Sequence, residues 1–362
     1  MSTPVQSKQQ STYNSNALPG SVITQLQNAK DLAVNRLLRP NSFSNIVGIG
    51  LGRKVVGAEV TDTRCVRIYV QSKYDLDALN PSDVVPQSFL DIPTDVIEVG
   101  RLGRAGNRSA PRDDQKLPDT GPGSSIRLKT TSPNVNQGAA GTLGAVVGDG
   151  QLRYILSCNH VLNVNGRVNG RVQVEPDTST YVVTPALSAN PVQIALPGKF
   201  FVELIPGQQN TVDCGIAPLL DGQSTLVRAN LRAAPAGNSR RADDPAAPGS
   251  AIGDADRGQR VKKDGAVTGL TSGTVVDVNA DFYVQYSFGT FLFTNQVVIE
   301  GDDDGFAADG DSGSIVIESE KHQALAMIFA ESGRFAVACP LTEVFRQLRI
   351  KASAPGLSLL QY

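Results

Sequence analysis

Ser312 lies between an aspartate and a glycine in the stretch GFAADGDSGSIVI, residues 305–317, directly before an apolar run. Short clusters of Gly, Asp and Ser are commonly tight turns. The same cluster can instead hold a nucleophilic serine, with backbone N–H groups of the turn aimed at one point beside it. A serine hydroxyl becomes a good nucleophile only when a neighbouring base takes its proton. The second interpretation therefore requires a suitably placed histidine.

Histidine is scarce in this chain, which contains two. His322 lies in the polar stretch ESEKHQAL, which is typical of a solvated turn. His160 ends the strand-like run in LRYILSCNHVLNVNG, where it can be structural or can act as a base. A catalytic histidine needs an acidic group to orient it. Asp213, in NTVDCGIAPLL, can simply open a strand, but it is costly to bury without a partner, and we expect His160 to be that partner.

The order of these residues along the chain, His160, Asp213 and Ser312, is that of the chymotrypsin-type serine proteases. An α/β-hydrolase would need GxSxG and the opposite order, but residue 314 is serine. The motifs GDSGS, LSCNHV and VDCGIAPL resemble those of the trypsin-like superfamily. Three further segments are similar to those of a trypsin-like subfamily that includes bacterial proteins and the plant narrow-leaf regulators. They are VKKDGAVTGLTSGTV (261–275) and the N-terminal VGIGLG and IPTDVIEVG.

The resemblance implies a mainly β fold of two perpendicular six-stranded β-barrels preceded by a small α+β domain. His160 and Asp213 would belong to the first barrel and Ser312 to the second. The implied activity is that of a serine endopeptidase, with Ser312 as nucleophile, His160 as base and Asp213 orienting it. The amides of Gly310 and Ser312 would form the oxyanion hole, and Asp311 would hold the turn.

The resemblance also predicts where substrate binds. Phe306 would lie at the base of the primary pocket, and Phe329, Ala330 and Glu331 would lie on the substrate-binding strand. Phenylalanine at the base predicts a shallow apolar pocket for small or medium aliphatic side chains, whereas a shifted loop would put Asp304 there instead. No activation site is evident before the protease motifs, so either no processing is needed or another group orders the serine turn.

Composition predicts five segments along the chain. In order they are a disordered tail, an α+β domain, a linker, the protease domain and a short tail, at 1–20, 21–100, 101–123, 124–353 and 354–362. The protease domain would comprise barrel one, a crossover, barrel two and a C-terminal helix, at about 124–232, 233–259, 260–340 and 341–350. Glycines 48, 50 and 52 are spaced GxGxG without a following helix, so we do not interpret them as a nucleotide-binding loop.

Bulk properties exclude several classes of function. A net charge of -2 gives no reason to expect nucleic-acid binding. A membrane span would need a run of about 18 apolar residues, and the sequence has none. The polar N-terminus has no signal-peptide pattern, so we expect a cytoplasmic protein. Four widely spaced cysteines predict free thiols rather than a zinc site. No cofactor or metal is expected, because Phe306 interrupts the weak calcium-like motif GDDDG.

Two functions stay open at this point. The first is an endopeptidase acting on protein or peptide substrates. The second is a catalytically silent trypsin-like scaffold that serves as a protein-binding or regulatory module. In either case the N-terminal domain is a candidate surface for a partner or for a second copy of the chain. Reaction with a fluorophosphonate probe distinguishes the two functions, because only an activated serine reacts.

Overall fold

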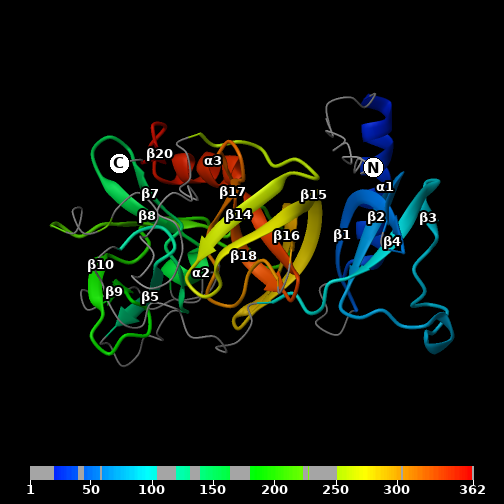
Figure 1. Cartoon of the computed structure of the whole chain (residues 1–362), viewed down its shortest axis with the longest axis horizontal. Helices are drawn as coiled ribbons and strands as arrows, with labels where there is room; N and C mark the ends of the chain where they lie inside the picture. Colours follow the sequence, from blue (N-terminus) through cyan, green and yellow to red (C-terminus); the bar gives the residue numbers. More distant parts are fainter. Residues whose placement is uncertain are drawn as a thin grey trace, which may run out of the picture.

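The structure is a computed structural model. The structure describes residues 20–39, 45–57, 59–103, 120–130, 139–163, 180–222, 227, 251–302 and 305–360. The N-terminal unit lies at one end of the long axis, the second barrel in the middle and the first barrel at the other end (Figure 1). Most of the expected N-terminal tail, linker and crossover lies outside the described residues.

The N-terminal unit is one helix against a small sheet. Its elements are α1 (Gly20–Leu37), β1 (Ile46–Val56), β2 (Glu59–Val70), a 3₁₀ turn (Leu76–Ala78), β3 (Ser88–Phe89) and β4 (Ile92–Glu98). The spacing of Leu26, Ala29 and Ala33 in the sequence predicts a helix over 21–38. The structure confirms it within a residue, and these three side chains are buried on one face. No helix of the described residues is long and apolar enough to cross a membrane.

The N-terminal sheet continues into β15 and the strands that follow it. Strand β1 pairs with β15 (Gly269–Tyr286) through Gly48–Phe282 and Ile49–Asp281, so one sheet of 11 strands runs through both parts. The sequence predicts two separate strands in GTVVDV and FYVQYSF, but they form one strand of 18 residues. The alternation of buried and exposed side chains slips between Val275 and Phe282, where β15 has three register shifts. A bulged strand therefore looks like two strands in the sequence.

The GxGxG spacing belongs to the contact between β1 and β15. A Cβ on Gly48 would overlap the ring of Phe282, and one on Gly50 would overlap the carboxylate of Asp277. Alternate residues of a strand share one face, so glycines at this spacing clear that face for a close approach. The rejection of a nucleotide-binding loop is confirmed, because these glycines lie within a strand.

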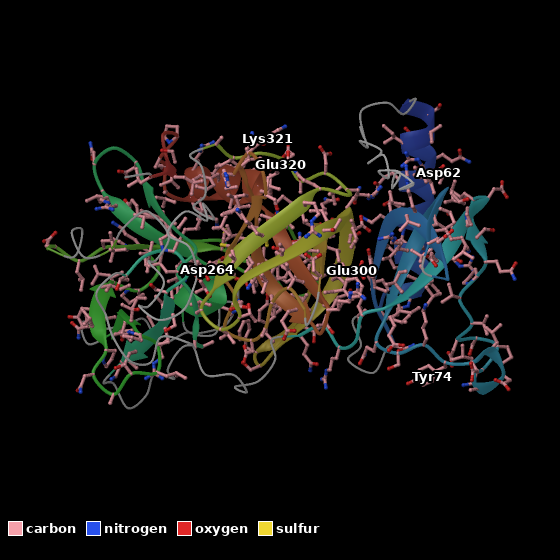
Figure 2. The ribbon with its side chains drawn as sticks, in the orientation of Figure 1. Asp62, Tyr74, Asp264, Glu300, Glu320 and Lys321 are labelled. Atoms are coloured by element: carbon pink, nitrogen blue, oxygen red, sulfur yellow. The ribbon has the colours of Figure 1, made fainter. Side chains whose placement is uncertain are left out.

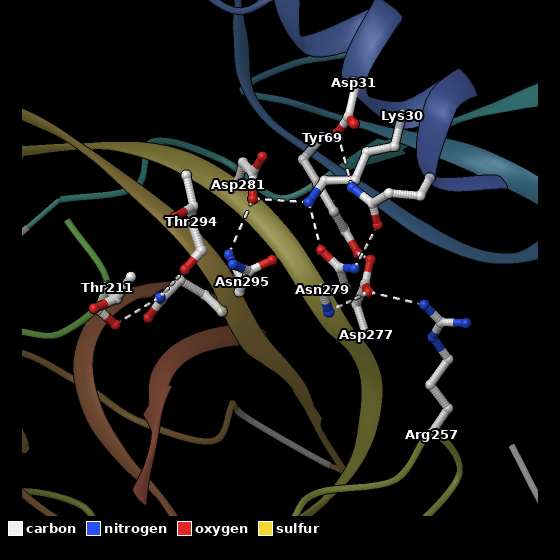
Figure 3. A network of polar contacts seen from close by, with 12 residues as sticks. Lys30, Asp31, Tyr69, Thr211, Arg257, Asp277, Asn279, Asp281, Thr294 and Asn295 are labelled. Carbon is white, nitrogen blue, oxygen red and sulfur yellow. Dashed lines mark hydrogen bonds and ion pairs between the residues drawn. The ribbon is translucent and has the colours of Figure 1, made fainter. Parts of the chain in front are cut away.

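Buried polar contacts join the N-terminal unit to β15 (Figure 3). Lys30 of α1, only 1% exposed, donates to Asp281 Oδ1 at 2.8 Å and contacts Asn279 Oδ1 at 2.5 Å. The Tyr69 hydroxyl of β2 donates to Asp277 Oδ2 at 3.0 Å. A buried ammonium needs a charged partner, so these bonds fix the N-terminal unit on β15. Its outer side carries exposed residues such as Asp62 and Tyr74 (Figure 2).

The second barrel is a ring of six antiparallel strands. They are β14 (Arg260–Gly265), β15, β16 (Gly289–Gly301), β17 (Ile315–Glu318), β18 (Ala324–Ser332) and β19 (Phe335–Pro340). Pairing runs β14–β15–β16–β19–β18–β17 and returns from β17 to β14. Its core is a separate cluster that includes Val261, Ile299, Phe306 and Val316.

The first barrel is a second ring of six strands, one of which is bent. Its strands are β5 (Ser125–Thr130), the bent pair β6 (Gly141–Thr142) and β7 (Ala145–Gly148), β8 (Arg153–Ser157), β9 (Thr180–Thr184), β10 (Val192–Ala195) and β13 (Gly215–Pro218). Pairing runs β10–β9–β5–β6 and β7–β8–β13, and a bridge between Ala195 and Leu219 closes it. The predicted mainly β double barrel is confirmed, while the angle between the barrels stays a prediction.

Short elements complete the fold. They are α2 (Asn159–Leu162), β11 (Phe200–Phe201), β12 (Gln209–Asn210), α3 (Leu341–Lys351) and β20 (Ser358–Leu359). The helix predicted over 341–350 is confirmed as α3. The tail predicted over 354–362 differs from the structure, because β20 pairs with β7. Leu357 and Leu359 alternate along this segment and are both buried, which fixes the C-terminal end on the first barrel.

Candidate active site

His160 and Asp213 meet in the first barrel, as predicted. His160 lies in α2, which begins two residues after the end of β8, and Asp213 lies two residues before the start of β13, the neighbour of β8. The Nδ1 atom of His160 is 2.5 Å from Asp213 Oδ2, and the His160 amide donates to Oδ1 at 3.2 Å. Both side chains are completely buried. The carboxylate therefore fixes both the backbone and the ring of His160.

A tyrosine from the second barrel completes the surroundings of Asp213. The Tyr286 hydroxyl, at the end of β15, donates to Asp213 Oδ2 at 2.8 Å. The Tyr286 ring also lies edge-on to the His160 ring, with centroids 5.3 Å apart. Burial by itself would raise the pKa of Asp213, but the attraction of His160 and the hydrogen bonds from His160 and Tyr286 hold that pKa below its usual value.

The serine turn has two unused amides. Gly310 and Gly313, on either side of Asp311 and Ser312, have φ values of 98° and 101°, which favour glycine. The amides of Asp311 and Gly313 donate to backbone carbonyls at 2.9 and 2.8 Å. Within the described residues, the amides of Gly310 and Ser312 have no hydrogen-bond acceptor. This pair of free donors is what an oxyanion hole requires.

Asp311 holds this turn through a buried network with the loop between β14 and β15. Its Oδ1 accepts from the amides of Val267 and Thr268, at 2.8 and 3.2 Å. Its Oδ2 accepts from the Thr268 hydroxyl at 2.5 Å and lies 3.3 Å from the Lys263 ammonium. Lys263 and Asp311 are both completely buried. An internal lysine therefore supplies the cation that pairs with this aspartate.

The β18 strand brings the histidine and serine segments together. The carbonyl of Ile328 accepts from the Gly313 amide at 2.8 Å and from the Cys158 thiol at 3.2 Å. Gly313 follows Ser312 directly, and Cys158 lies two residues before His160. Ser312 is 8% exposed. Among the described residues, the buried Nε2 of His160 has no hydrogen-bond partner, so this nitrogen is free to take a proton.

Three of the four cysteines surround Asp213. Cys158, Cys214 and Cys339 are free and buried, as is Cys65, so the predicted thiols are confirmed. Cys158, His160 and Asp213 place potential metal ligands within 4.8 Å of one another. Burial, followed by the charge of Asp213, raises the pKa of Cys158 well above its usual value. A neutral thiol that donates to a carbonyl is a poor metal ligand, and the histidine and carboxylate already bind each other.

Three of the four residues predicted to bind substrate have buried side chains. The side chains of Phe306 and Phe329 are completely buried, and Ala330 is 2% exposed. Phe306 belongs to the core of the second barrel, and Phe329 packs on Phe293 with ring centroids 4.5 Å apart. Both aromatic rings therefore pack in hydrophobic cores, Phe306 from the loop between β16 and β17 and Phe329 from β18. The substrate-binding role of these residues stays a prediction. Asp304, the alternative base of the pocket, lies outside the described residues.

Glu331 is the predicted substrate-strand residue whose side chain is partly exposed. Burial raises the pKa of Glu331 to about 7, and the negative charges of Asp309 and Asp311 add to the shift.

His322 lies in the hairpin between β17 and β18, with φ 57°, and takes no part in this site.

Two supporting residues escaped the sequence analysis, although each had a signal. Lys263 shares the inward face of β14 with Val261, and a lysine on an apolar face implies a buried acid. Tyr286 follows Phe282 and Val284 on the buried face of β15, and a buried hydroxyl implies an acceptor. Neither signal identifies the partner, because both partners are distant in the sequence.

Solved structures similar to the chain are bacterial serine proteases. A glutamic acid specific serine protease is 21% identical over 67% of this chain and all of that one, with a TM-score of 0.42. Thermobifida fusca protease A is 18% identical over 67% of this chain and 98% of its own, with a TM-score of 0.40. The chymotrypsin of Cellulomonas bogoriensis is 15% identical over 67% of this chain and all of its own, again at 0.40. No protein-family model and no curated protein matches the chain.

Proposed function

We propose that the chain is a serine endopeptidase that hydrolyses peptide bonds through an acyl-enzyme. The carrying observation is the buried His160–Asp213 pair at 2.5 Å, whose outer ring nitrogen has no partner among the described residues. The segments of His160 and Ser312 meet at the Ile328 carbonyl, which accepts from both Cys158 and Gly313. A base that is oriented on one side and unpaired on the other is what a serine nucleophile needs.

Each residue has a distinct role in the proposed reaction. Ser312 Oγ attacks the scissile carbonyl, and its proton passes to His160 Nε2 as the tetrahedral intermediate forms. The amides of Gly310 and Ser312 donate to the oxyanion. His160 then gives the proton to the leaving amine, and a water activated by the same nitrogen releases the acyl group. Asp213, held by Tyr286, keeps His160 Nδ1 protonated and stabilises the imidazolium.

The buried Lys263–Asp311 pair supports a protease that needs no newly released N-terminus. Asp311 has its cation, its two amide donors and the Thr268 hydroxyl from within the chain. The serine turn is therefore ordered in the intact protein, and we expect activity without processing. The preference for small or medium aliphatic residues at the cleaved position stays a prediction.

Covalent labelling tests the proposal and separates it from the silent-scaffold alternative. Incubation with a fluorophosphonate should modify the intact chain at Ser312, identified by peptide mass spectrometry. Ser312→Ala should abolish the modification without lowering the melting temperature, and His160→Ala should slow it by orders of magnitude. Absence of labelling in the folded wild-type protein, or labelling at a different serine, would favour the scaffold.

A further inference from the structure

Within the part of the chain that the structure describes, one edge of β18 leads away from Ser312 without pairing to another strand of the sheet. β17 pairs with β18 as far as Ile315–Met327, and the Gly313 amide then donates to Ile328. Beyond that point, β19 covers one edge through pairs such as Glu331–Ala336. A strand edge beside a nucleophilic serine can bind an extended peptide, which pairs with the edge through backbone hydrogen bonds as an added strand.

The chain's own segment 99–103, directly after β4, lies on this edge. Gly103 forms an antiparallel bridge with Glu331 of β18 and a parallel bridge with Gln285 of β15. The Ser332 hydroxyl donates to the carbonyl of Val99. Gly103 therefore takes the position of an added strand between β15 and β18.

Side-chain contacts fit the segment to its place. Leu102 is 3% exposed and belongs to the main core cluster. Arg101 donates to the side-chain oxygen of Gln285. Gly100 has φ 77°, and a Cβ there would come within 2.6 Å of the Ser332 hydroxyl oxygen. These contacts hold the backbone close to β18, as a bound peptide would be held.

The direction of the segment matches that of a substrate. β18 runs from Ile328, beside the serine turn, outward to Ser332, so an antiparallel segment runs inward toward Ser312. The acyl half of a peptide must approach in the same direction to present its carbonyl to Ser312.

We infer that segment 99–103 occupies the backbone site for the acyl side of a peptide substrate and competes with it from within the chain. The inference rests on the proposed protease function. Extended peptides then bind only after Gly103 leaves β18, whereas small reagents reach Ser312 without displacing it.

Two serine-directed probes separate these effects. A fluorophosphonate reports Ser312 alone, whereas a tripeptidyl diphenyl phosphonate ending in valine also needs the β18 edge. Gly103→Pro removes the backbone N–H and should weaken the added strand. Gly103→Ala is the control, because its Cβ would meet only the Gln285 carbonyl oxygen, at 3.5 Å. Weakening the Gly103–Glu331 bridge by about the free energy of one hydrogen bond should speed the peptidyl probe by about five- to tenfold and leave the fluorophosphonate rate unchanged.

Each result has a defined meaning. A faster peptidyl reaction in Gly103→Pro, with Gly103→Ala like wild type, supports competition. An unchanged or slower peptidyl reaction with a normal fluorophosphonate rate overturns it. If Gly103→Pro also loses the fluorophosphonate reaction, Arg101→Ala decides, with a smaller rise in the peptidyl rate expected and no rise counting against the inference. A wild-type protein inert to both probes would instead contradict the proposed function.

Discussion

Two stretches of β15 make long-range contacts of opposite kinds. At its end, Tyr286 reaches Asp213 through one hydroxyl, and the bond acts on a single carboxylate. In its middle, residues 277–282 meet the N-terminal unit through glycine backbone and a buried lysine. In the proposed reaction the first contact orients the acid that holds the catalytic base, whereas the second contact holds a sheet together. Substitutions that affect the contact at the end of β15 should therefore lower the reaction rate of Ser312. Substitutions in the middle of β15 should lower the stability of the protein.

The largest expected effect is on the catalytic side of this comparison. Asp213→Asn should lower the fluorophosphonate reaction rate by about 10⁴-fold, because asparagine favours the wrong tautomer of His160. Asp281→Asn, the same change at a buried aspartate of β15, is the control. It leaves Lys30 without its charged partner, so it should lower the melting temperature while the rate stays near wild type. Equal loss of rate in both variants would erase the distinction.

The serine turn should depend on its buried ion pair for stability. Lys263→Met leaves Asp311 charged and buried without a cation, which should lower the free energy of unfolding by about 3–5 kcal/mol. Arg260→Met, also on β14, breaks an exposed pair with Asp302 and should cost about 0–1 kcal/mol. Urea unfolding of the two variants measures both values. A stable Lys263→Met protein that still labels at Ser312 would remove the proposed role of Lys263.

A smaller effect is expected on the N-terminal side. Gly50→Ala puts a methyl group against the Asp277 carboxylate and should destabilise the β1–β15 contact by about 1–3 kcal/mol. Gly356→Ala, where a Cβ would meet nothing within 4 Å, is the control. Thermal unfolding gives the difference, and the fluorophosphonate rate at a low temperature should be unchanged. A tolerated Gly50→Ala would show that the GxGxG spacing has another cause.

The smallest effect is a pH dependence at Glu331. Because burial and the nearby aspartates raise its pKa to about 7, the folded protein favours the protonated acid. The unfolded chain ionises near the ordinary value of 4.5, so this contribution to stability is lost as pH rises through about 7. Glu331→Gln removes this pH dependence of stability. The free energy of unfolding of the variant, relative to that of the wild type, should therefore increase between pH 4.5 and 7. Parallel curves for the two proteins would contradict the shifted pKa.

The sequence predicted the His160–Asp213 pair well, because the chemistry of a buried acid and a base restricts the candidates. With two histidines in the chain, the need for a base next to Ser312 left His160 as the residue to test, and the need for a buried partner pointed to Asp213. The amphipathic helix α3 was equally readable, since its buried leucines and phenylalanine recur at helical spacing.

Long-range packing was not readable in the same way. Gly48 and Gly50 show that something approaches closely, but the partner lies more than 200 residues away on β15. The predicted pocket side chain Phe329 turned into the core, because strand alternation and not motif position decides which way a side chain points. The edge position of Gly103 depends on three elements at once, β4, β15 and β18, and no local pattern carries it.

The central claim is that Ser312, His160 and Asp213 cleave peptide bonds. The most direct measurement compares the new N-termini produced in a denatured protein mixture by the wild-type chain and by Ser312→Ala at equal concentration. We expect new N-termini in the mixture treated with the wild-type chain, and we expect them to be absent from the mixture treated with Ser312→Ala. A folded wild-type protein that labels at Ser312 but produces the same N-termini as Ser312→Ala would contradict it.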